Sequence, residues 1–254
     1  MKKRVVALLL AGVLGAVCVT GCGSSKETAV ESTETQEAAP VEEMAEQEAE
    51  ETDAETEEEA EDTDVDQQVA DQVAALIDAI YVQERTDDTD KQCADAKAAW
   101  DALTEDQKAL VEGENADPDY FGRDTGDASQ DDPRNQDEIG ENEILVVSFG
   151  TSFNSSRVAD IKGIEDALQE AYPDWSVRRA FTAQIIINHV QAREGEFIDN
   201  MDQALERAVS NGVKNLIVQP THLMHGAEYD ELAAAVENYQ DQFESVKIAE
   251  PLLG

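Results

Sequence analysis

Basic residues are scarce in this sequence, and their scarcity excludes one large class of function. Lysine and arginine together number 18 against 58 aspartates and glutamates, which gives a formal net charge of −40. A protein that binds nucleic acid neutralises phosphates with a basic face, and no basic stretch of that kind is present. We therefore expect no nucleic-acid partner, whereas a cationic substrate would be attracted only in a general way.

Cysteine is also sparse, because the chain contains only Cys18, Cys22 and Cys93. Three residues at these spacings form neither a disulfide framework nor a zinc-binding pattern. Cys18 and Cys22 belong to the N-terminal apolar segment. Cys93 lies in a stretch with helical periodicity, where we expect it to be a small buried residue.

The N-terminus has the form of an export signal. A basic start, MKKR, precedes an apolar run from Val5 to Val19 that is too short for a stable membrane span. The following VTGCG resembles a bacterial lipobox, in which the cysteine is lipidated and becomes the first mature residue. We expect a lipoprotein signal peptide at 1–22, and anchoring through Cys22 to the extracytoplasmic face of the cell membrane. The other interpretation is an ordinary secretory signal in which Cys22 is incidental.

The next 120 or so residues, from 23 to 142, divide by composition into three segments. Residues 23–66 contain almost no large apolar side chain, which predicts a disordered, extended acidic linker. In residues 67–113 apolar residues return with helical spacing, and Thr104 and Gln107 fit a capping box. This segment resembles small helical spacers of bacterial surface proteins, and we expect it to act as a stalk or docking element. Residues 114–142, rich in Asn, Asp, Pro and Gly, are predicted to be a second linker.

Residues 143–254 alternate apolar strands with amphipathic helices. This order predicts an α/β fold, with a parallel four-stranded sheet and helices on both faces. Ligands of such sheets bind beyond the carboxyl ends of the strands, so the loops 150–156 and 220–229 should line one crevice. The expected strands are 144–149, 177–181, 214–219 and 246–249, and the expected helices start near 155 and span 183–193, 200–211 and 227–239.

The first of these loops is led by Gly150 and runs into a helix start. Free N–H groups there would suit an anion, although the same pattern fits a plain tight turn capped by Ser155 or Ser156. The loop has neither the lysine of a phosphate-binding P-loop nor the spacing of a dinucleotide fingerprint.

The second loop gathers most of the ionisable chemistry. It contains His222, His225, Glu228 and Tyr229, and imidazole with carboxylate can bind a divalent metal or move protons near neutral pH. The alternative is that both histidines have only solvent or backbone partners. The remaining histidine, His189, lies inside a predicted helix, where we expect a half-buried structural role.

Four stretches of the C-terminal part resemble one known family. They are ILVVSFGTSF, RAFTAQIIINHV, MDQALERAVSNGVKNLIVQPTHLMHGAEYDEL and the final EPLLG. They are similar to the N-terminal half of the anaerobic sirohydrochlorin cobaltochelatases, in the class II chelatase superfamily. The resemblance implies half of a two-lobed fold around a tetrapyrrole cleft, and insertion of Co²⁺ into sirohydrochlorin during cobalamin biosynthesis. The metal is a substrate there, and no organic cofactor is implied.

The resemblance also implies roles for individual residues. It assigns His222 and Glu228 to the metal, with Glu228 as the one candidate catalytic residue. Phe149 stands where a chelatase histidine would lie, and Glu228 where a second would lie, so no catalytic histidine is carried over. The implied tetrapyrrole-binding residues are Ser148, Gly150, Thr151, Ser152, Thr182, Gly226 and Tyr229.

Three functions remain open from these observations. The first is a cobaltochelatase fragment that lacks the catalytic half, or whose cleft is closed by homo-oligomerisation. The second is a membrane-anchored surface lipoprotein that captures haem, another tetrapyrrole or metal without turnover, with His222 as a ligand. The third is a purely structural surface protein.

The lipid anchor gives a direct prediction. Cells fed radiolabelled palmitate should label the full chain, and Cys22→Ala should abolish the label, because that sulfur is the proposed attachment atom. Gel autoradiography measures this, with Cys93→Ala as the control that keeps the label. An unlabelled wild-type protein would contradict the prediction.

Overall fold

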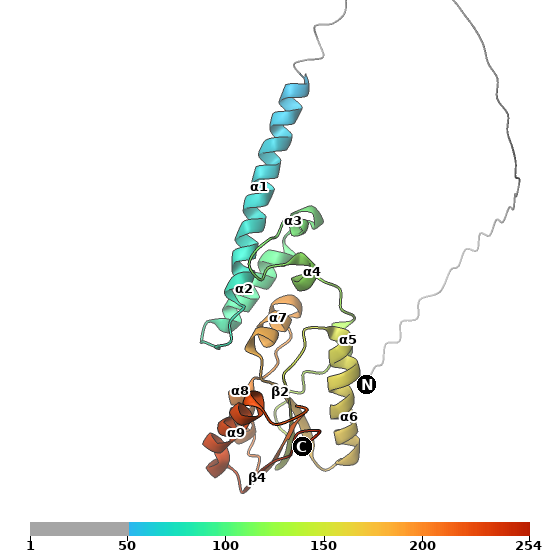
Figure 1. The fold of residues 1–254 in the computed structure, drawn as a ribbon, viewed down its shortest axis with the longest axis vertical. Coiled ribbons are helices and arrows are strands. Elements are labelled where there is room, and N and C mark those ends of the chain that lie inside the picture. The colour runs from blue at the N-terminus through green and yellow to red at the C-terminus, as the bar shows by residue number, and fades with distance from the viewer. Residues whose placement is uncertain (1–50) are drawn as a thin grey trace, which may run out of the picture. The chain divides into compact units, whose positions relative to one another are not determined.

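The computed structural model describes the backbone of residues 51–254 and the side chains from residue 64 onward (Figure 1). The predicted signal peptide, its Cys22 and residues 23–50 of the predicted linker lie outside these residues. Within the described range, no helix has the length and apolar character to cross a membrane.

The first helix, α1 (Glu51–Ala79), begins earlier than the sequence predicts. We expected an extended linker up to residue 66, but residues 51–66 are helical. Glutamate and alanine are strong helix formers, and acidic side chains near a helix N-terminus interact favourably with its dipole. These local preferences outweigh the repulsion between like charges that suggested an extended chain.

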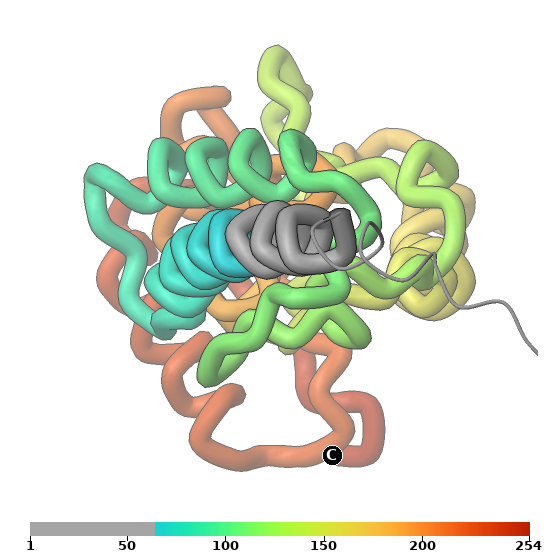
Figure 2. The backbone as a smooth tube through the Cα atoms, turned by 90° about the horizontal axis from the view of Figure 1, so that it is seen from above, coloured from blue at the N-terminus to red at the C-terminus, as the bar shows by residue number. Residues whose placement is uncertain are grey.

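Helices α2 (Thr89–Asp101) and α3 (Glu105–Ala109) pack with α1 into a helical module. Figure 2, which looks down α1, shows α2 running beside it. Thr104 and Gln107 form the predicted capping box at the start of α3. Cys93 is fully buried, as expected, and burial raises the pKa of its thiol to about 11. The module core includes Ala70, Val73, Ile77, Ile80, Cys93, Ala96, Trp100, Leu103 and Phe121.

Residues 114–142, predicted to be a linker, are instead packed against both neighbouring parts. They contain α4 (Pro118–Phe121) and a 3-10 turn, η1 (Ala128–Gln130), each capped by a preceding aspartate. Phe121 is buried in the module core, and Arg134 is buried against the sheet. We call residues 120–134 the belt. Its aspartates cap local turns, as Asp124 and Asp127 do, or form ion pairs, as Asp131 does, and composition alone does not distinguish these roles from those of a linker.

The C-terminal part forms the predicted parallel sheet. The strands β1 (Asn142–Ser148), β2 (Ser176–Phe181), β3 (Asn215–Pro220) and β4 (Ser245–Ile248) are arranged in the order β2-β1-β3-β4. All three pairings are parallel, so the four carboxyl ends lie at one edge. This confirms the α/β fold class.

Helices cover both faces of this sheet. The alternate residues Leu145 and Val147 pack with α8 (Met201–Ser210) and α9 (Ala227–Tyr239), whereas Ile144 and Val146 pack on the side of α6 (Lys162–Ala171). A short α5 (Asn154–Ser156) and a π-helical turn, η2 (Arg157–Ile161), precede α6. The remaining elements are α7 (Gln184–Glu194), which contacts α2, and a final 3-10 turn, η3 (Gln240–Gln242).

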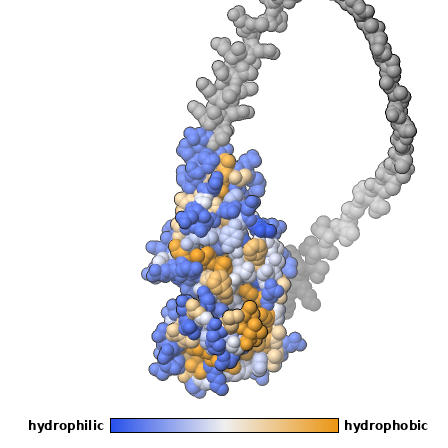
Figure 3. Space-filling view, in the orientation of Figure 1, coloured by the Kyte–Doolittle hydropathy of each residue, from blue (hydrophilic) through white to orange (hydrophobic). Residues whose placement is uncertain are grey.

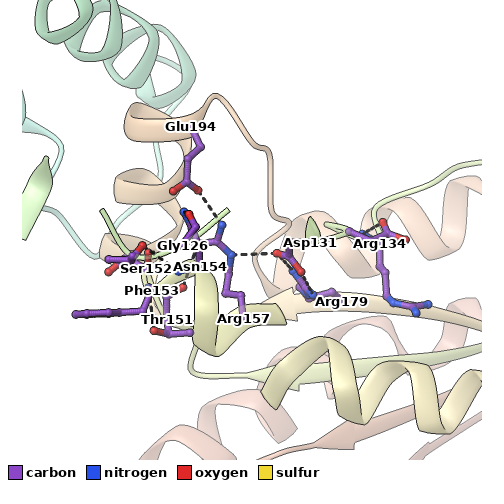
Figure 4. A network of polar contacts seen from close by, with 12 residues as sticks. Gly126, Asp131, Arg134, Thr151, Ser152, Phe153, Asn154, Arg157, Arg179 and Glu194 are labelled. Atoms are coloured by element: carbon purple, nitrogen blue, oxygen red, sulfur yellow. Dashed lines mark hydrogen bonds and ion pairs between the residues drawn. The ribbon is translucent and has the colours of Figure 1, made fainter. Parts of the chain in front are cut away.

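A buried ion network joins the belt to the sheet (Figure 4). Asp131 accepts hydrogen bonds from Arg157 Nε at 3.0 Å and from Arg179 Nη1 at 2.7 Å. Arg179 also binds both oxygens of Glu165 at 2.8 Å. Burial by itself would raise the pKa of Asp131, but the bonds from Arg179 and Arg157 outweigh it and hold that pKa below its usual range. Asp131 therefore stays ionised between the two guanidinium groups.

Removing this carboxylate should strongly destabilise the fold. Asp131→Asn leaves two buried guanidinium groups without their shared counter-charge, which costs about 3–5 kcal/mol in the free energy of unfolding. Denaturant titration measures the loss. The control is Asp137→Asn, which breaks an ion pair with Arg207. The Asp137 side chain is 62% exposed, so this change should cost less than about 1 kcal/mol. Equal losses for the two variants would contradict the prediction.

A second buried carboxylate predicts a pH dependence of stability. Glu143 on β1 is fully buried 3.6 Å from Arg178 on β2, and burial raises its pKa to about 7 despite that arginine. The folded state therefore holds a proton that the unfolded state releases near pH 4.5. The contribution of Glu143 to stability is full below about pH 4.5 and falls by about 3 kcal/mol as pH rises through 7. In Glu143→Gln, denaturation between pH 4.5 and 8 should lack this decline, and an unchanged slope would refute it.

Candidate functional site

The carboxyl ends of β1, β2 and β3 bring the two predicted loops together. Thr221, after β3, donates from its N–H to the Val147 carbonyl at 2.9 Å and from its hydroxyl to the Ser148 hydroxyl at 2.9 Å. Thr182, after β2, donates from its N–H to the Ser148 carbonyl at 2.9 Å. The loops after β1 and β3 therefore share one edge of the sheet, as the topology predicts. We call this the carboxyl edge.

Glu228 is held at this edge by a contact between two predicted site residues. It lies in the first turn of α9, where helix N–H groups favour a negative charge, and it is half-buried. Its Oε2 accepts a hydrogen bond from the Thr182 hydroxyl at 2.8 Å. This hydrogen bond comes from the loop after β2. It fixes the orientation of the Glu228 carboxylate, which would otherwise rotate freely at the surface.

His222 is the least satisfied polar side chain of the second loop. Both of its ring nitrogens are buried and have no hydrogen-bond partner among the described residues. Its carbonyl accepts from Leu252 N at 2.9 Å, and the next carbonyl, of Leu223, accepts from Leu253 N at 2.9 Å. The segment that follows β4 thus runs beside this loop. The imidazole nitrogens are therefore not committed to a partner within the described residues.

His225 has partners of its own and lies on the outer side of the loop. Its Nε2 is 3.0 Å from a carboxylate oxygen of Glu250, and its ring meets Tyr229 edge-on with centroids 4.5 Å apart. Gly226, at the cap position before α9, is exposed. The structure therefore separates the two histidines that the sequence analysis grouped together.

A metal site made by this chain alone is not present in the described residues. No group of three or more His, Cys, Asp or Glu side chains gathers there to hold a metal ion. His222 and Glu228, the predicted metal ligands, accordingly have no third protein ligand beside them in this part of the chain.

The belt contacts the first loop and occupies its helix-start donors, which favours the tight turn over the anion site that the sequence analysis left open. The N–H groups of Asn154 and Ser155 donate to the hydroxyl and the carbonyl of Thr125, at 3.1 and 2.8 Å. These helix-start donors are therefore occupied. Neither Ser155 nor Ser156 caps the helix, because the cap position falls on Phe153 and the acceptors come from the belt.

The predicted ligand residues of the first loop divide into buried and accessible ones. Ser152 is 2% exposed with its hydroxyl 3.3 Å from that of Tyr120, and Ser148 is buried with its hydroxyl bound by Thr221. Gly150 and Thr151 are half-buried. Gly150 has a φ of +102°, and an added Cβ would lie 2.6 Å from the Phe181 ring, so the turn requires glycine.

Large apolar side chains surround the polar residues at this edge. Figure 3 shows apolar residues gathered on part of the visible face. The loops after the four strands, at 149–153, 182–183, 221–229 and 249–254, contain no lysine or arginine. Large apolar side chains exposed in loops at one edge are typical of an interaction surface. We call it the apolar rim, and it consists of Phe149, Leu223, Met224, Leu252 and Leu253, which are 49–74% exposed.

Residues that the sequence analysis did not single out hold the first loop in place. Arg157 and Arg193 both donate to the backbone carbonyl of Ser152, and Tyr120 contacts its hydroxyl. Nothing in the sequence distinguishes Arg157 from the other charged residues of the same stretch, such as Asp160 and Lys162. His189 is fully buried, which confirms a structural role and exceeds the half-burial expected.

Comparisons with known proteins agree with this fold. Residues 142–254 match the family model described as cobalt chelatase (CbiK). The sirohydrochlorin cobaltochelatase of Salmonella typhimurium is 34% identical over 110 residues, which are 43% of this chain and 42% of that protein. The sirohydrochlorin cobaltochelatase CbiKC of Nitratidesulfovibrio vulgaris is 30% identical over 112 residues, 43% of this chain and 39% of that protein.

The match has a defined extent. It begins at the first residue of β1, so it takes in the α/β part and leaves out the helical module and the belt. The chain spans about two fifths of the length of these curated relatives. Residues 142–254 are therefore similar to a part of the cobalt chelatases.

Proposed function

We propose that the carboxyl edge is one wall of a chelatase cleft in which Co²⁺ is inserted into sirohydrochlorin, a step of anaerobic cobalamin biosynthesis. The observation that carries the proposal is the oriented Glu228 carboxylate, bound to Thr182 and bordered by the apolar rim. A flat macrocycle needs an apolar surface against its face and a polar group near its centre, and this edge offers both.

The chemistry divides among the residues of the wall. Metal insertion removes two pyrrole protons, bends the ring and delivers a desolvated cation. Glu228 would accept a proton or hold the cation, and a His222 nitrogen would bind the metal. The face of the ring would lie on the apolar rim, near Gly150, Thr151, Gly226 and Tyr229.

Complete turnover requires more groups than this wall carries. Phe149 and Glu228 stand where the family resemblance places histidines, and His222 is the histidine of the second loop whose ring nitrogens have no partner among the described residues. We propose that a second α/β lobe faces the apolar rim, supplied by another copy of this chain or by further sequence. The domain here would then be the half that binds rather than the half that catalyses.

A second candidate function is capture of a tetrapyrrole or of a divalent metal without turnover. The unpartnered nitrogens of His222 favour it, because one imidazole is sufficient as an axial or metal ligand. The proposed anchor at Cys22 favours it as well, since it would place the domain outside the cell, away from cytoplasmic biosynthesis.

The two functions differ in one absorption experiment. The purified chain is mixed with sirohydrochlorin and Co²⁺, and the spectrum of the ring is followed. Insertion by the wild type should fall at least about 100-fold in Glu228→Gln, which keeps a hydrogen bond to Thr182 but loses the charge. Glu231→Gln, an exposed change on the same helix, is the control. Insertion supports a cleft closed by a second copy of this chain. Binding without insertion favours capture, or a cleft that further sequence completes, and absence of any binding rejects both functions.

A further inference from the structure

We propose that Arg193 is a positioning residue for the loop after β1 at the carboxyl edge. The helical module in turn holds the Arg193 side chain through His189 and Tyr81. Arg193 would act by fixing the loop after β1, so the inference rests on the proposed function of the carboxyl edge. It gives the helical module, which lies outside the matched family region, a part in ligand binding.

Two guanidinium groups converge on one backbone carbonyl of the loop. Arg193 donates from Nη2 to the Ser152 carbonyl, and Arg157 donates to the same oxygen from Nη1 at 3.4 Å. Glu194 lies between them, with one oxygen 2.7 Å from Arg193 Nε and the other 2.8 Å from Arg157 Nη2. Charge-assisted bonds are stronger than neutral ones, so the carbonyl is turned inward and held there.

The fixed peptide determines the accessible part of the loop. Phe153 N–H donates to the Thr151 hydroxyl at 3.1 Å, and Arg193 also reaches the Asn154 side-chain oxygen at 3.3 Å. Gly150 and Thr151, which precede the held carbonyl, are both partly exposed. Release of the Ser152 carbonyl would let both of them move at the carboxyl edge.

His189 links Arg193 to the helical module in one defined protonation state. A guanidinium can only donate, so Arg193 Nη1 donates to His189 Nε2 at 3.3 Å. Burial, assisted by the Arg193 charge, lowers the pKa of His189 to about 3, so the ring is neutral. Its single proton is then on Nδ1, which donates to the Tyr81 hydroxyl at 2.9 Å. Tyr81 follows directly after α1.

The module reaches the loop by a second route through the belt. The Tyr120 ring packs edge-on against His189 with centroids 4.7 Å apart, and its hydroxyl is 3.3 Å from that of Ser152. Lys97 of α2 donates to the Arg193 carbonyl at 3.1 Å. These contacts form a continuous path from the module through α7 to the loop after β1.

Hydrogen exchange and ligand affinity in the full chain test the proposal. Arg193→Met keeps the aliphatic length and removes the donors, and it should speed amide exchange in residues 149–156 by at least tenfold while residues 215–220 stay unchanged. The Kd for sirohydrochlorin should rise about tenfold in parallel. Arg193→Lys, which keeps one charged donor, should restore most of both. The control is Arg85→Met, which breaks an ion pair with Asp90 in the module and should change neither.

Each outcome decides one question. Faster exchange throughout the chain, or unchanged exchange in residues 149–156, overturns the positioning role. Faster loop exchange with an unchanged Kd overturns the role in binding. If Arg193→Met does not fold, Tyr81→Phe takes its place, because it removes only the hydroxyl and should raise loop exchange two- to fivefold. If the wild type binds no sirohydrochlorin, the proposed function fails, while the exchange result still decides whether Arg193 holds the loop.

Discussion

The carboxylate of Asp131 is the contact on which the arrangement of the candidate site depends. It belongs to the belt, outside any helix or strand, yet it neutralises Arg157 on the π-helical turn and Arg179 on β2. Arg157 connects Asp131 to the loop after β1, because the same guanidinium also donates a hydrogen bond to the Ser152 carbonyl. The position of the loop after β1 therefore depends on a residue that precedes the whole α/β domain in the chain.

A buried network of this kind favours one arrangement over many. Fully buried guanidinium groups carry a large desolvation cost that only complete pairing offsets, so partly formed alternatives are strongly disfavoured. The opposite side of the sheet is less completely paired: Arg178 binds Asp199 at 2.9 Å, but its Nε and Nη1 have no hydrogen-bond partner among the described residues. Such rigidity suits a surface that would bind a flat ring, because a mobile surface would lose conformational entropy each time the ring bound.

Local pattern was sufficient for most of the fold. The apolar run from Ile144 gave β1, and the helix predicted for 227–239 coincides with α9. The convergence of the two loops followed from parallel topology. The belt could not be predicted, because its contacts join residues far apart in the sequence: the Thr125 hydroxyl accepts from the N–H of Asn154, 29 residues later. The acidic, glycine-containing sequence around Thr125 does not distinguish such a partner from a linker residue. For the same reason the contact between the Ser152 and Tyr120 hydroxyls was not predictable.

The charge of the carboxyl edge constrains which parts of the substrates each lobe of the proposed cleft would bind. Its loops carry Glu228 and Glu250 but no lysine or arginine. Sirohydrochlorin is a polycarboxylate, so such a wall attracts the metal ion and repels the acidic periphery of the ring. On the proposed function, the ring would be held here by its apolar face, while its carboxylates would find their cationic partners on the facing lobe. The wall described here is thus better suited to presenting a cation to the ring than to recognising the ring's edge.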